Sequence, residues 1–174
     1  GSVALDTVDT PSGENIEGLG GAATFLSLAA SNYTDVNLVG VIGTDFPQEH
    51  IDLLKSKDIN LEGLETADGK TFRWKGHYHE DLNVRDTLET HLNVFETWEP
   101  KLPQIAKEAP YLFLGNIHPA IQMSVLEQAD QKFVALDTMN LWIDIANDEL
   151  KAIVGKIDCL IINDEEVIQL TGDH

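Results

Sequence analysis

Residues 20–30 read Gly20-Gly21-Ala22-Ala23-Thr24-Phe25-Leu26-Ser27-Leu28-Ala29-Ala30, which is a glycine pair directly before an apolar run with helical spacing. Glycine at a helix start lets the backbone approach a bound molecule, and the N–H groups and the helix dipole there attract oxygen-rich or anionic groups. Asp6 closes a strand-like stretch earlier in the chain. These features predict a ligand cradle; a glycine-rich turn before a core helix is the alternative.

Short apolar runs alternate with helical patterns along most of the chain. The strand-like runs cover residues 3–5, 36–42, 111–114, 133–136 and 159–162, and the helical patterns cover 22–31, 47–55, 119–131, 145–153 and 163–170. This alternation predicts an α/β fold with a mostly parallel sheet flanked by helices. Residues 70–97 instead show near period-two alternation with aromatics, so we expect a small antiparallel sheet there, with a further strand from residues 8–18.

The composition excludes several classes of partner. Thirty acidic residues against 11 basic ones give a net charge of −19, so we expect neither a nucleic acid nor a membrane as partner. With 43% hydrophobic residues the chain can bury a core. The sequence shows no membrane-length apolar stretch and no leader, which predicts a cytoplasmic protein. The single cysteine, Cys159, excludes a disulfide framework.

Polar residues follow four of the predicted elements, at the strand ends where parallel sheets bind ligands. They are Gly43-Thr44-Asp45, Gly115-Asn116-Ile117-His118, Asp137-Thr138-Met139-Asn140 and Asn163-Asp164-Glu165-Glu166. Helix capping explains any one of these groups, because Asp, Asn and Thr are preferred caps. The four together favour a site on that edge of the sheet.

Two competing sites are disfavoured. Residues 18–23 fit the dinucleotide fingerprint G-x-G-x-x-A, but no apolar strand leads directly into them, which argues against a nicotinamide- or flavin-dependent oxidoreductase. His77 and His79 share a strand face on which His91 or Glu80 would have to complete a metal site, but no tetrahedral set is apparent. A polar face on a solvated strand explains these histidines more simply.

The aromatic residues leave two interpretations open. Trp74, Tyr78 and Trp98 are equally consistent with core packing and with a stacking wall for a ring-shaped ligand. The sequence does not decide between these roles.

The order of these features resembles the N-terminal part of a ribokinase-like (PfkB-type) carbohydrate or nucleoside kinase. The resemblance covers essentially all of residues 1–174. It rests on residues 1–6 as the first strand, the Gly20-Gly21 pair, residues 40–45 and the N-x-x-E element at 163–166. It implies a partial ribokinase-like α/β domain that lacks the C-terminal part of the fold, with residues 8–18 and 70–97 as a β lid.

The resemblance also implies roles for individual residues. The expected substrate-binding residues are Asp6, Gly20, Gly21, Phe25, Asn116 and Asp137. Asn163 and Glu166 would organise phosphate and Mg²⁺, Glu166 acting through metal-bound water, with no direct metal ligand in the chain. ATP and Mg²⁺ are the implied cofactors, and neither site is complete. The family's catalytic aspartate would lie beyond residue 174, so no catalytic residue is expected here.

Phe25 departs from the family pattern. It stands where sugar kinases of this group carry the asparagine of G-G-x-x-x-N, which argues against plain ribose and leaves a nucleoside, an inositol-like polyol or another ring-bearing acceptor. The prediction is therefore ATP-dependent phosphorylation of a sugar, polyol or nucleoside hydroxyl, with this chain as the acceptor-binding half and inactive alone. The alternative is a non-catalytic small-molecule binding or interaction module. A homodimer through the lid or an exposed sheet edge is also expected.

Overall fold

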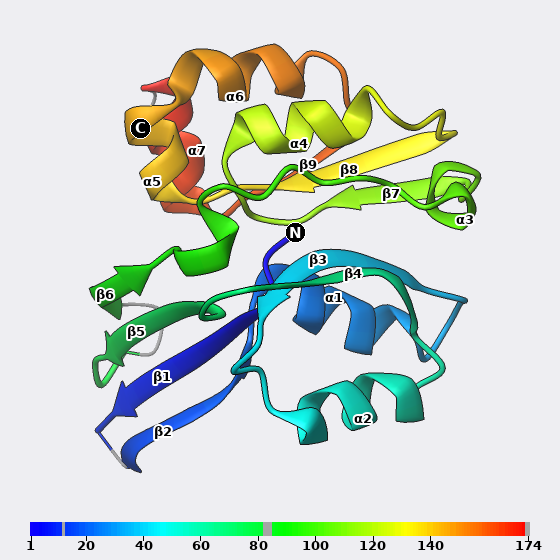
Figure 1. The fold of residues 1–174 in the computed structure, drawn as a ribbon. Coiled ribbons are helices and arrows are strands. Elements are labelled where there is room, and N and C mark those ends of the chain that lie inside the picture. The colour runs from blue at the N-terminus through cyan, green and yellow to red at the C-terminus, as the bar shows by residue number, and fades with distance from the viewer. Residues whose placement is uncertain (12, 82–84, 173–174) are drawn as a thin grey trace. The chain divides into compact units, whose positions relative to one another are not determined.

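The computed structural model describes residues 1–11, 13–81 and 85–172. The chain forms two compact units (Figure 1). The first unit is Ser2–Trp98, and the second consists of Gly1 and Glu99–His174.

The first unit contains a four-stranded sheet of order β2-β1-β5-β6, which we call the lid sheet. Its strands are β1 (Ala4–Thr10), β2 (Gly13–Gly20), β5 (Phe72–Tyr78) and β6 (Arg85–His91). The outer pairs are antiparallel as expected, whereas β1 and β5 in the centre are parallel. Strands β5 and β6 lie within the predicted segment 70–97, whereas β1 and β2 extend beyond the predicted segment 8–18, to Ala4 and to Gly20. Ser12 and residues 82–84 of these segments lie outside the described residues.

The rest of the first unit is an α/β layer. Strand β3 (Asn37–Gly43) pairs in parallel with β4 (Asn60–Ala67), and the helices are α1 (Ala22–Ala30), α2 (Gln48–Ser56) and the short 3₁₀ helix η1 (Asn93–Phe95). The core comprises Val3, Ala23, Leu38, Ile42, Leu54 and Ile59. The sequence did not predict β4, because only Gly63 of this strand is buried and its charged residues interrupt any apolar run.

The second unit alternates strands and helices as the sequence predicted. Strands β7 (Tyr111–Leu114), β8 (Phe133–Asp137) and β9 (Cys159–Ile161) form a parallel sheet in that order. The helices are α3 (Gln104–Lys107), α4 (Pro119–Leu126), α5 (Asn140–Ile145), α6 (Asn147–Val154) and α7 (Asp164–Thr171). Two boundaries differ from the prediction. Helix α4 ends at Leu126, and the pattern over 145–153 is divided by Ala146, whose φ of −139° is not helical.

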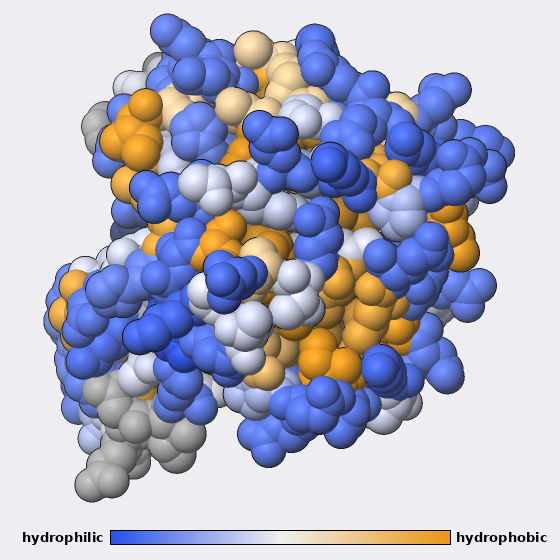
Figure 2. All heavy atoms as spheres, viewed as in Figure 1, coloured by the Kyte–Doolittle hydropathy of each residue, from blue (hydrophilic) through white to orange (hydrophobic). Residues whose placement is uncertain are grey.

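Hydrophilic side chains cover much of the face shown in Figure 2, as the excess of acidic residues leads one to expect. No helix within the described part of the chain is long and apolar enough to cross a membrane.

The carboxylate of Asp45 fastens the lid sheet to the carboxyl end of β3. Its Oδ1 accepts hydrogen bonds from the Thr71 backbone N–H (2.7 Å) and hydroxyl (2.8 Å). Its Oδ2 lies 2.7 Å from Nη1 of Arg73 on β5. The Thr71 hydroxyl accepts in turn from the Gly43 N–H at 3.0 Å. Burial opposes ionisation of Asp45, but these hydrogen bonds outweigh it and lower the Asp45 pKa, so the network is intact at neutral pH.

Removing this carboxylate is expected to destabilise the first unit. Asp45→Ala leaves the fully buried Thr71 without its acceptor and removes one of the two carboxylate partners of Arg73, so the free energy of unfolding should fall by about 2–3 kcal/mol. The matched control is Asp52→Ala, because Asp52 accepts one hydrogen bond from Gln48 on exposed α2 and its loss should cost less than about 0.5 kcal/mol. Urea denaturation measures both, and equal losses would contradict the role of Asp45.

Candidate functional site

Asp6 and the glycine pair meet where β1 approaches the start of α1. The Asp6 carboxylate lies against Gly20 so closely that a Cβ at residue 20 would overlap it. The backbone N–H of Gly21 donates a hydrogen bond to this carboxylate. Gly21 has a φ of 94°, and a Cβ there would overlap the Ser2 carbonyl. Only glycine fits at these two positions, because any side chain would displace Asp6 or the backbone.

The first N–H groups of α1 are not free donors for a ligand, unlike the sequence-based expectation. The N–H of Ala22 donates to the Ser2 hydroxyl at 3.1 Å, and that of Ala23 donates to the Ser2 carbonyl at 3.0 Å. With the Gly21 N–H bound to Asp6, the chain itself satisfies three donors. The Asp6 carboxylate is therefore the polar group that this cradle offers.

Burial raises the pKa of Asp6 to about 6, and the hydrogen bond from the Gly21 N–H offsets only part of that rise. The folded state thus retains a proton on Asp6 in a pH range where the unfolded chain has lost it. Asp6 contributes stability while it is protonated, and this contribution is lost as the pH rises from about 4 to about 6. At neutral pH the ionised carboxylate lowers the stability of the fold.

Asp6→Asn should therefore stabilise the protein at pH 7.5, by about 1–2 kcal/mol in the free energy of unfolding. The amide oxygen can still accept from the Gly21 N–H but carries no charge. The gain over the unmodified chain should shrink as the pH falls and vanish near pH 4. Denaturation curves from pH 4 to 8 measure the difference, and a variant less stable than the unmodified chain at pH 7.5 would contradict this account.

Gly20→Ala should displace the carboxylate from its buried place. We expect the Asp6 pKa to fall from about 6 toward its usual range, because burial is the main cause of its rise. Gly18→Ala is the matched control on the same strand, since a Cβ at residue 18 meets no atom within 4 Å. Carbon-13 NMR titration of the Asp6 carboxyl in the two variants makes the comparison. An unchanged pKa in Gly20→Ala would show that the carboxylate does not depend on this close approach.

The lid sheet has two chemically different faces. Strand pairing places Asp6 beside Trp74, and Trp74 beside Thr90, on one face. We call this the Asp6 face; its other members include Val8, Gly18, Gly20, Gly76 and Thr87. The opposite face, here called the charged face, carries Asp9, Glu17, Arg73, Lys75, His77, His79, Asp86, Glu89 and His91.

Charges on the charged face are paired within the sheet. Arg73 lies 3.0 Å from Glu17, and Lys75 lies 3.5 Å from Glu89. Each histidine faces a carboxylate: His77 faces Asp9 (3.2 Å), His79 faces Asp86 (2.9 Å) and His91 faces Glu89 (3.1 Å). Within the described residues, no group of three or more His, Cys, Asp or Glu side chains is placed to hold a metal ion. Pairing on a polar strand face accounts for these histidines.

The aromatic residues divide between packing and the lid sheet. Trp98 is 7% exposed, stacks on Phe95 at 5.8 Å and donates to Glu65, so it is a packing residue. Trp74 is only partly buried and lies on the Asp6 face. Phe25 on α1 is 59% exposed.

In the second unit, a buried glutamine holds the carboxyl ends of β7 and β8 together. Gln122 on α4 is fully buried, and its Nε2 lies 3.1 Å from each of three carbonyl oxygens, those of Leu114, Gly115 and Asp137. The loop that carries Asn116 and the chain that follows Asp137 therefore leave the sheet from fixed positions. Nothing in the sequence pattern singled out this residue as a contact of the strand ends. Its signal was a glutamine in segment 119–126, where Ser124 is the other polar residue.

Asp137 lies partly buried at the end of β8. Burial raises its pKa to about 6; the Asn116 N–H acts to lower it, and the nearby Glu166 charge adds to the rise. Its Oδ1 is buried and has no hydrogen-bond partner in the described part of the chain. The Asn116 side chain is engaged, because its Oδ1 accepts from Trp142 Nε1 at 2.8 Å. Asp137 thus retains unused acceptor capacity, whereas the Asn116 side-chain oxygen is already bonded.

Asn163 and Glu166 form a reciprocal cap at the start of α7. Asn163 Oδ1 accepts from the Glu166 N–H at 2.8 Å, and Glu166 Oε2 accepts from the Asn163 N–H at 3.1 Å. This capping box explains their spacing by itself. Glu166 is 8% exposed, and its charge influences Asp137.

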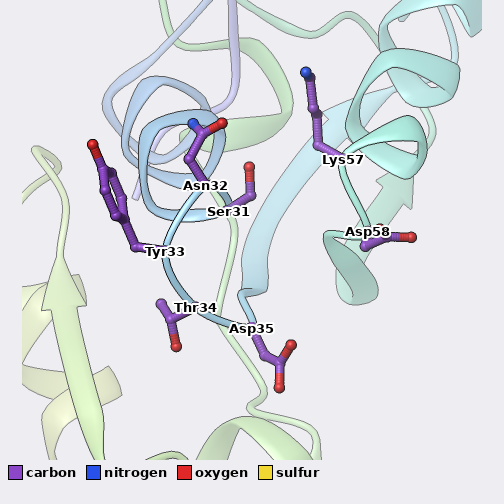
Figure 3. A pocket seen from close by; sticks show the side chains of 7 residues that line it. All are labelled: Ser31, Asn32, Tyr33, Thr34, Asp35, Lys57 and Asp58. Atoms are coloured by element: carbon purple, nitrogen blue, oxygen red, sulfur yellow. The ribbon is translucent and has the colours of Figure 1, made fainter.

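A pocket of about 410 Å³ lies away from the predicted site residues, where α1 and α2 end (Figure 3). Its lining consists of Ser31, Asn32, Tyr33, Thr34, Asp35, Lys57 and Asp58. The Ser31 hydroxyl and the Asn32 amide donate to the Leu28 carbonyl at the end of α1, both at 3.0 Å. Capping of α1 accounts for the polar side chains of Ser31 and Asn32, and we assign no ligand to this pocket.

The strand that precedes α1 also argues against a dinucleotide site. Residues 13–20 form β2, which runs antiparallel to β1. A dinucleotide fingerprint requires a strand of a parallel sheet that leads into the helix. The glycines at 18 and 20 instead belong to the lid sheet.

Comparison with known proteins supports a kinase fold. No family model matches the chain. The sequence is 29% identical over 176 residues to the cytidine kinase of Thermococcus kodakarensis, covering 99% of this chain and 63% of that kinase. The fold is similar to Burkholderia thailandensis nucleoside kinase in complex with inosine (TM-score 0.78, 15% identity, 99% of this chain and 61% of that one). It is equally similar to Cryptococcus neoformans ribokinase in complex with ADP (TM-score 0.78, 17% identity, 99% and 57%). The chain thus spans less than two thirds of each of these proteins.

Proposed function

We propose that this chain, which is similar in sequence to a cytidine kinase and in fold to a nucleoside kinase and a ribokinase, belongs to the ribokinase-like (PfkB-type) family and carries the acceptor-binding part of such an enzyme. The reaction is transfer of the terminal phosphate of ATP to a hydroxyl of a nucleoside, sugar or polyol. The cytidine kinase relative and the ribokinase that binds ADP support this reaction class.

The observation that carries the proposal is the Asp6 carboxylate held against Gly20 and Gly21. Among the described residues, the Asp6 carboxylate accepts a hydrogen bond from one backbone N–H, that of Gly21. A carboxylate can accept hydrogen bonds from two hydroxyl groups at once, which suits a vicinal diol. Gly20 leaves the space in which the Asp6 carboxylate itself lies beside the helix start.

Asp6 binds hydroxyls best when it is ionised. With a pKa of about 6, it is largely a carboxylate at neutral pH and becomes a carboxylic acid below pH 6. Acceptor affinity should therefore fall as the pH drops through this value. The same burial that lowers stability at neutral pH strengthens hydrogen bonds to the charged form.

In the second unit we propose that Asp137 and the Asn116 loop contribute further polar contacts to the acceptor. Asn163 and Glu166 would organise the magnesium and phosphate environment. The residues fit this role, because the helix cap uses Oε2 of Glu166 and a carboxylate has a second hard oxygen of the kind that Mg²⁺ prefers. Contact through metal-bound water, without a direct protein ligand, is the arrangement proposed. When bound, magnesium neutralises charge on the phosphates.

We place the catalytic base in the part of the kinase relatives that this chain does not span. A base must lie within hydrogen-bond reach of the attacking hydroxyl. We assign Asp6 to binding the acceptor, and the Glu166 carboxylate accepts a hydrogen bond in the cap of α7. The chain by itself should consequently bind the acceptor without phosphorylating it.

Titration calorimetry and a phosphorylation assay with labelled ATP test this function. The panel contains pentoses, hexoses, inositols and nucleosides. We expect the 174-residue chain to bind an acceptor without turnover and Asp6→Asn to lose at least tenfold in affinity. Asp9→Asn is the control on the same strand, since Asp9 lies on the charged face beside His77; its affinity should stay within twofold.

Two results would overturn parts of the proposal. If no member of the panel binds, or if Asp6→Asn binds as tightly as the unmodified chain, the acceptor site is not at Asp6 and a non-catalytic interaction module is favoured. If the chain itself transfers phosphate, the base lies within these residues.

A further inference from the structure

Trp74 and Asp6 are neighbours on the Asp6 face of the lid sheet but lean in opposite directions. Their Cα atoms are partners in the β1·β5 pair. The Asp6 carboxylate reaches toward Gly20, which pairs with Ala4. The indole ring of Trp74 lies over Gly76, which pairs with Val8. The two side chains therefore diverge along the strands from a common level.

This divergence sets a minimum span between the two groups. Along the strands, the Asp6 side chain extends toward the level of Ala4, and the Trp74 side chain extends toward the level of Val8. A strand rises about 3.3 Å per residue, so these two levels, four residues apart, are separated by about 13 Å along the strands. One five-membered sugar ring bonded to Asp6 is too small to stack on the indole as well. An acceptor that contacts both must extend beyond its sugar ring.

Two contacts fix the orientation of the Trp74 indole ring. Its Nε1–H donates to the Thr87 hydroxyl across the β5·β6 pair at 3.2 Å. Gly76 makes room for the ring, because a Cβ at residue 76 would overlap the six-membered part. Trp74 is still partly exposed, so the ring is not enclosed by packing as Trp98 is. The ring is oriented by its own strand pair and offers apolar area on a face that also carries a carboxylate.

Planar aromatic rings prefer offset stacking on an indole, and nucleobases stack on aromatic side chains irrespective of base identity. We infer that Trp74 is a specificity-determining residue that stacks on the base of a nucleoside acceptor while Asp6 binds the ribose hydroxyls. The inference rests on the proposed function and narrows its acceptor class from sugars and polyols to nucleosides.

The test compares cytidine with methyl β-D-ribofuranoside, which has the same furanose ring without a base. In calorimetry the unmodified chain should bind cytidine at least tenfold more tightly than the furanoside. Trp74→Leu should lower cytidine affinity at least tenfold and change furanoside affinity less than twofold, whereas Trp74→Phe should retain most of the preference. Lys75→Ala, on the charged face of the same strand, is the control and should leave both affinities unchanged.

A second variant keeps the test valid even if Trp74→Leu fails to fold. Gly76→Ala should displace the indole ring and reduce the preference for cytidine over the furanoside. In a separate measurement, cytidine should quench tryptophan fluorescence in the unmodified chain, and this quenching should be lost in Trp74→Phe. Equal losses for both ligands, or an unchanged preference, would overturn the role of Trp74. Failure of the proposed function is distinguishable, because Asp6→Asn would then leave the binding of both ligands unchanged.

Discussion

The hydrogen bonds that Asp45 accepts hold the lid sheet against the end of β3 within the first unit. Through Thr71 and Arg73 this carboxylate joins the start of β5 to the end of β3. Strand β5 is the parallel partner of β1, so the position of Asp6 depends on where β5 is anchored. Asp45 thus anchors the strand that pairs with the strand of Asp6. Its lowered pKa keeps that anchor charged at neutral pH.

The two faces of the lid sheet show how polar groups are divided between structure and function. On the charged face, histidines, lysine and arginine have carboxylate partners within the sheet. On the Asp6 face, small residues and threonines surround one carboxylate and one indole. Exposed ion pairs contribute little stability individually, but they leave few unpaired charges on that face. The Asp6 face carries the carboxylate and the indole to which we assign the hydroxyls and the planar ring of the proposed acceptor.

Each of the two units contains a carboxylate whose burial lowers the stability of the fold at neutral pH. Asp6 in the first unit and Asp137 in the second each have a pKa raised to about 6, and burial is the main cause in both. Buried ionisable groups with strongly shifted pKa values are common at functional sites. Gly20 leaves room for the Asp6 carboxylate, and the hydrogen bond from Gln122 to the Asp137 carbonyl fixes the backbone of Asp137.

Much of this architecture is encoded in local sequence patterns. The alternation of apolar runs and helical patterns predicted the parallel strands of the second unit, the glycine pair marked the start of α1, and the N-x-x-E spacing marked the cap at Asn163. These features depend on the periods of helices and strands and on caps within a few residues. The lid segments were also predicted, because alternation of side chains is visible along one strand.

Other features depend on contacts between distant parts of the chain. Nothing near Asp6 in the sequence indicates that Trp74 lies beside it, that Asp45 accepts from Thr71, or that the helix start is satisfied by Ser2. Strand β4 escaped prediction because partial burial left no apolar run. The role of Gln122 escaped prediction because its three acceptors are backbone carbonyls at the ends of two strands. The sequence by itself determined the elements and the candidate carboxylates. Strand pairing and register, which are set by packing between distant segments, decided which of them share a face.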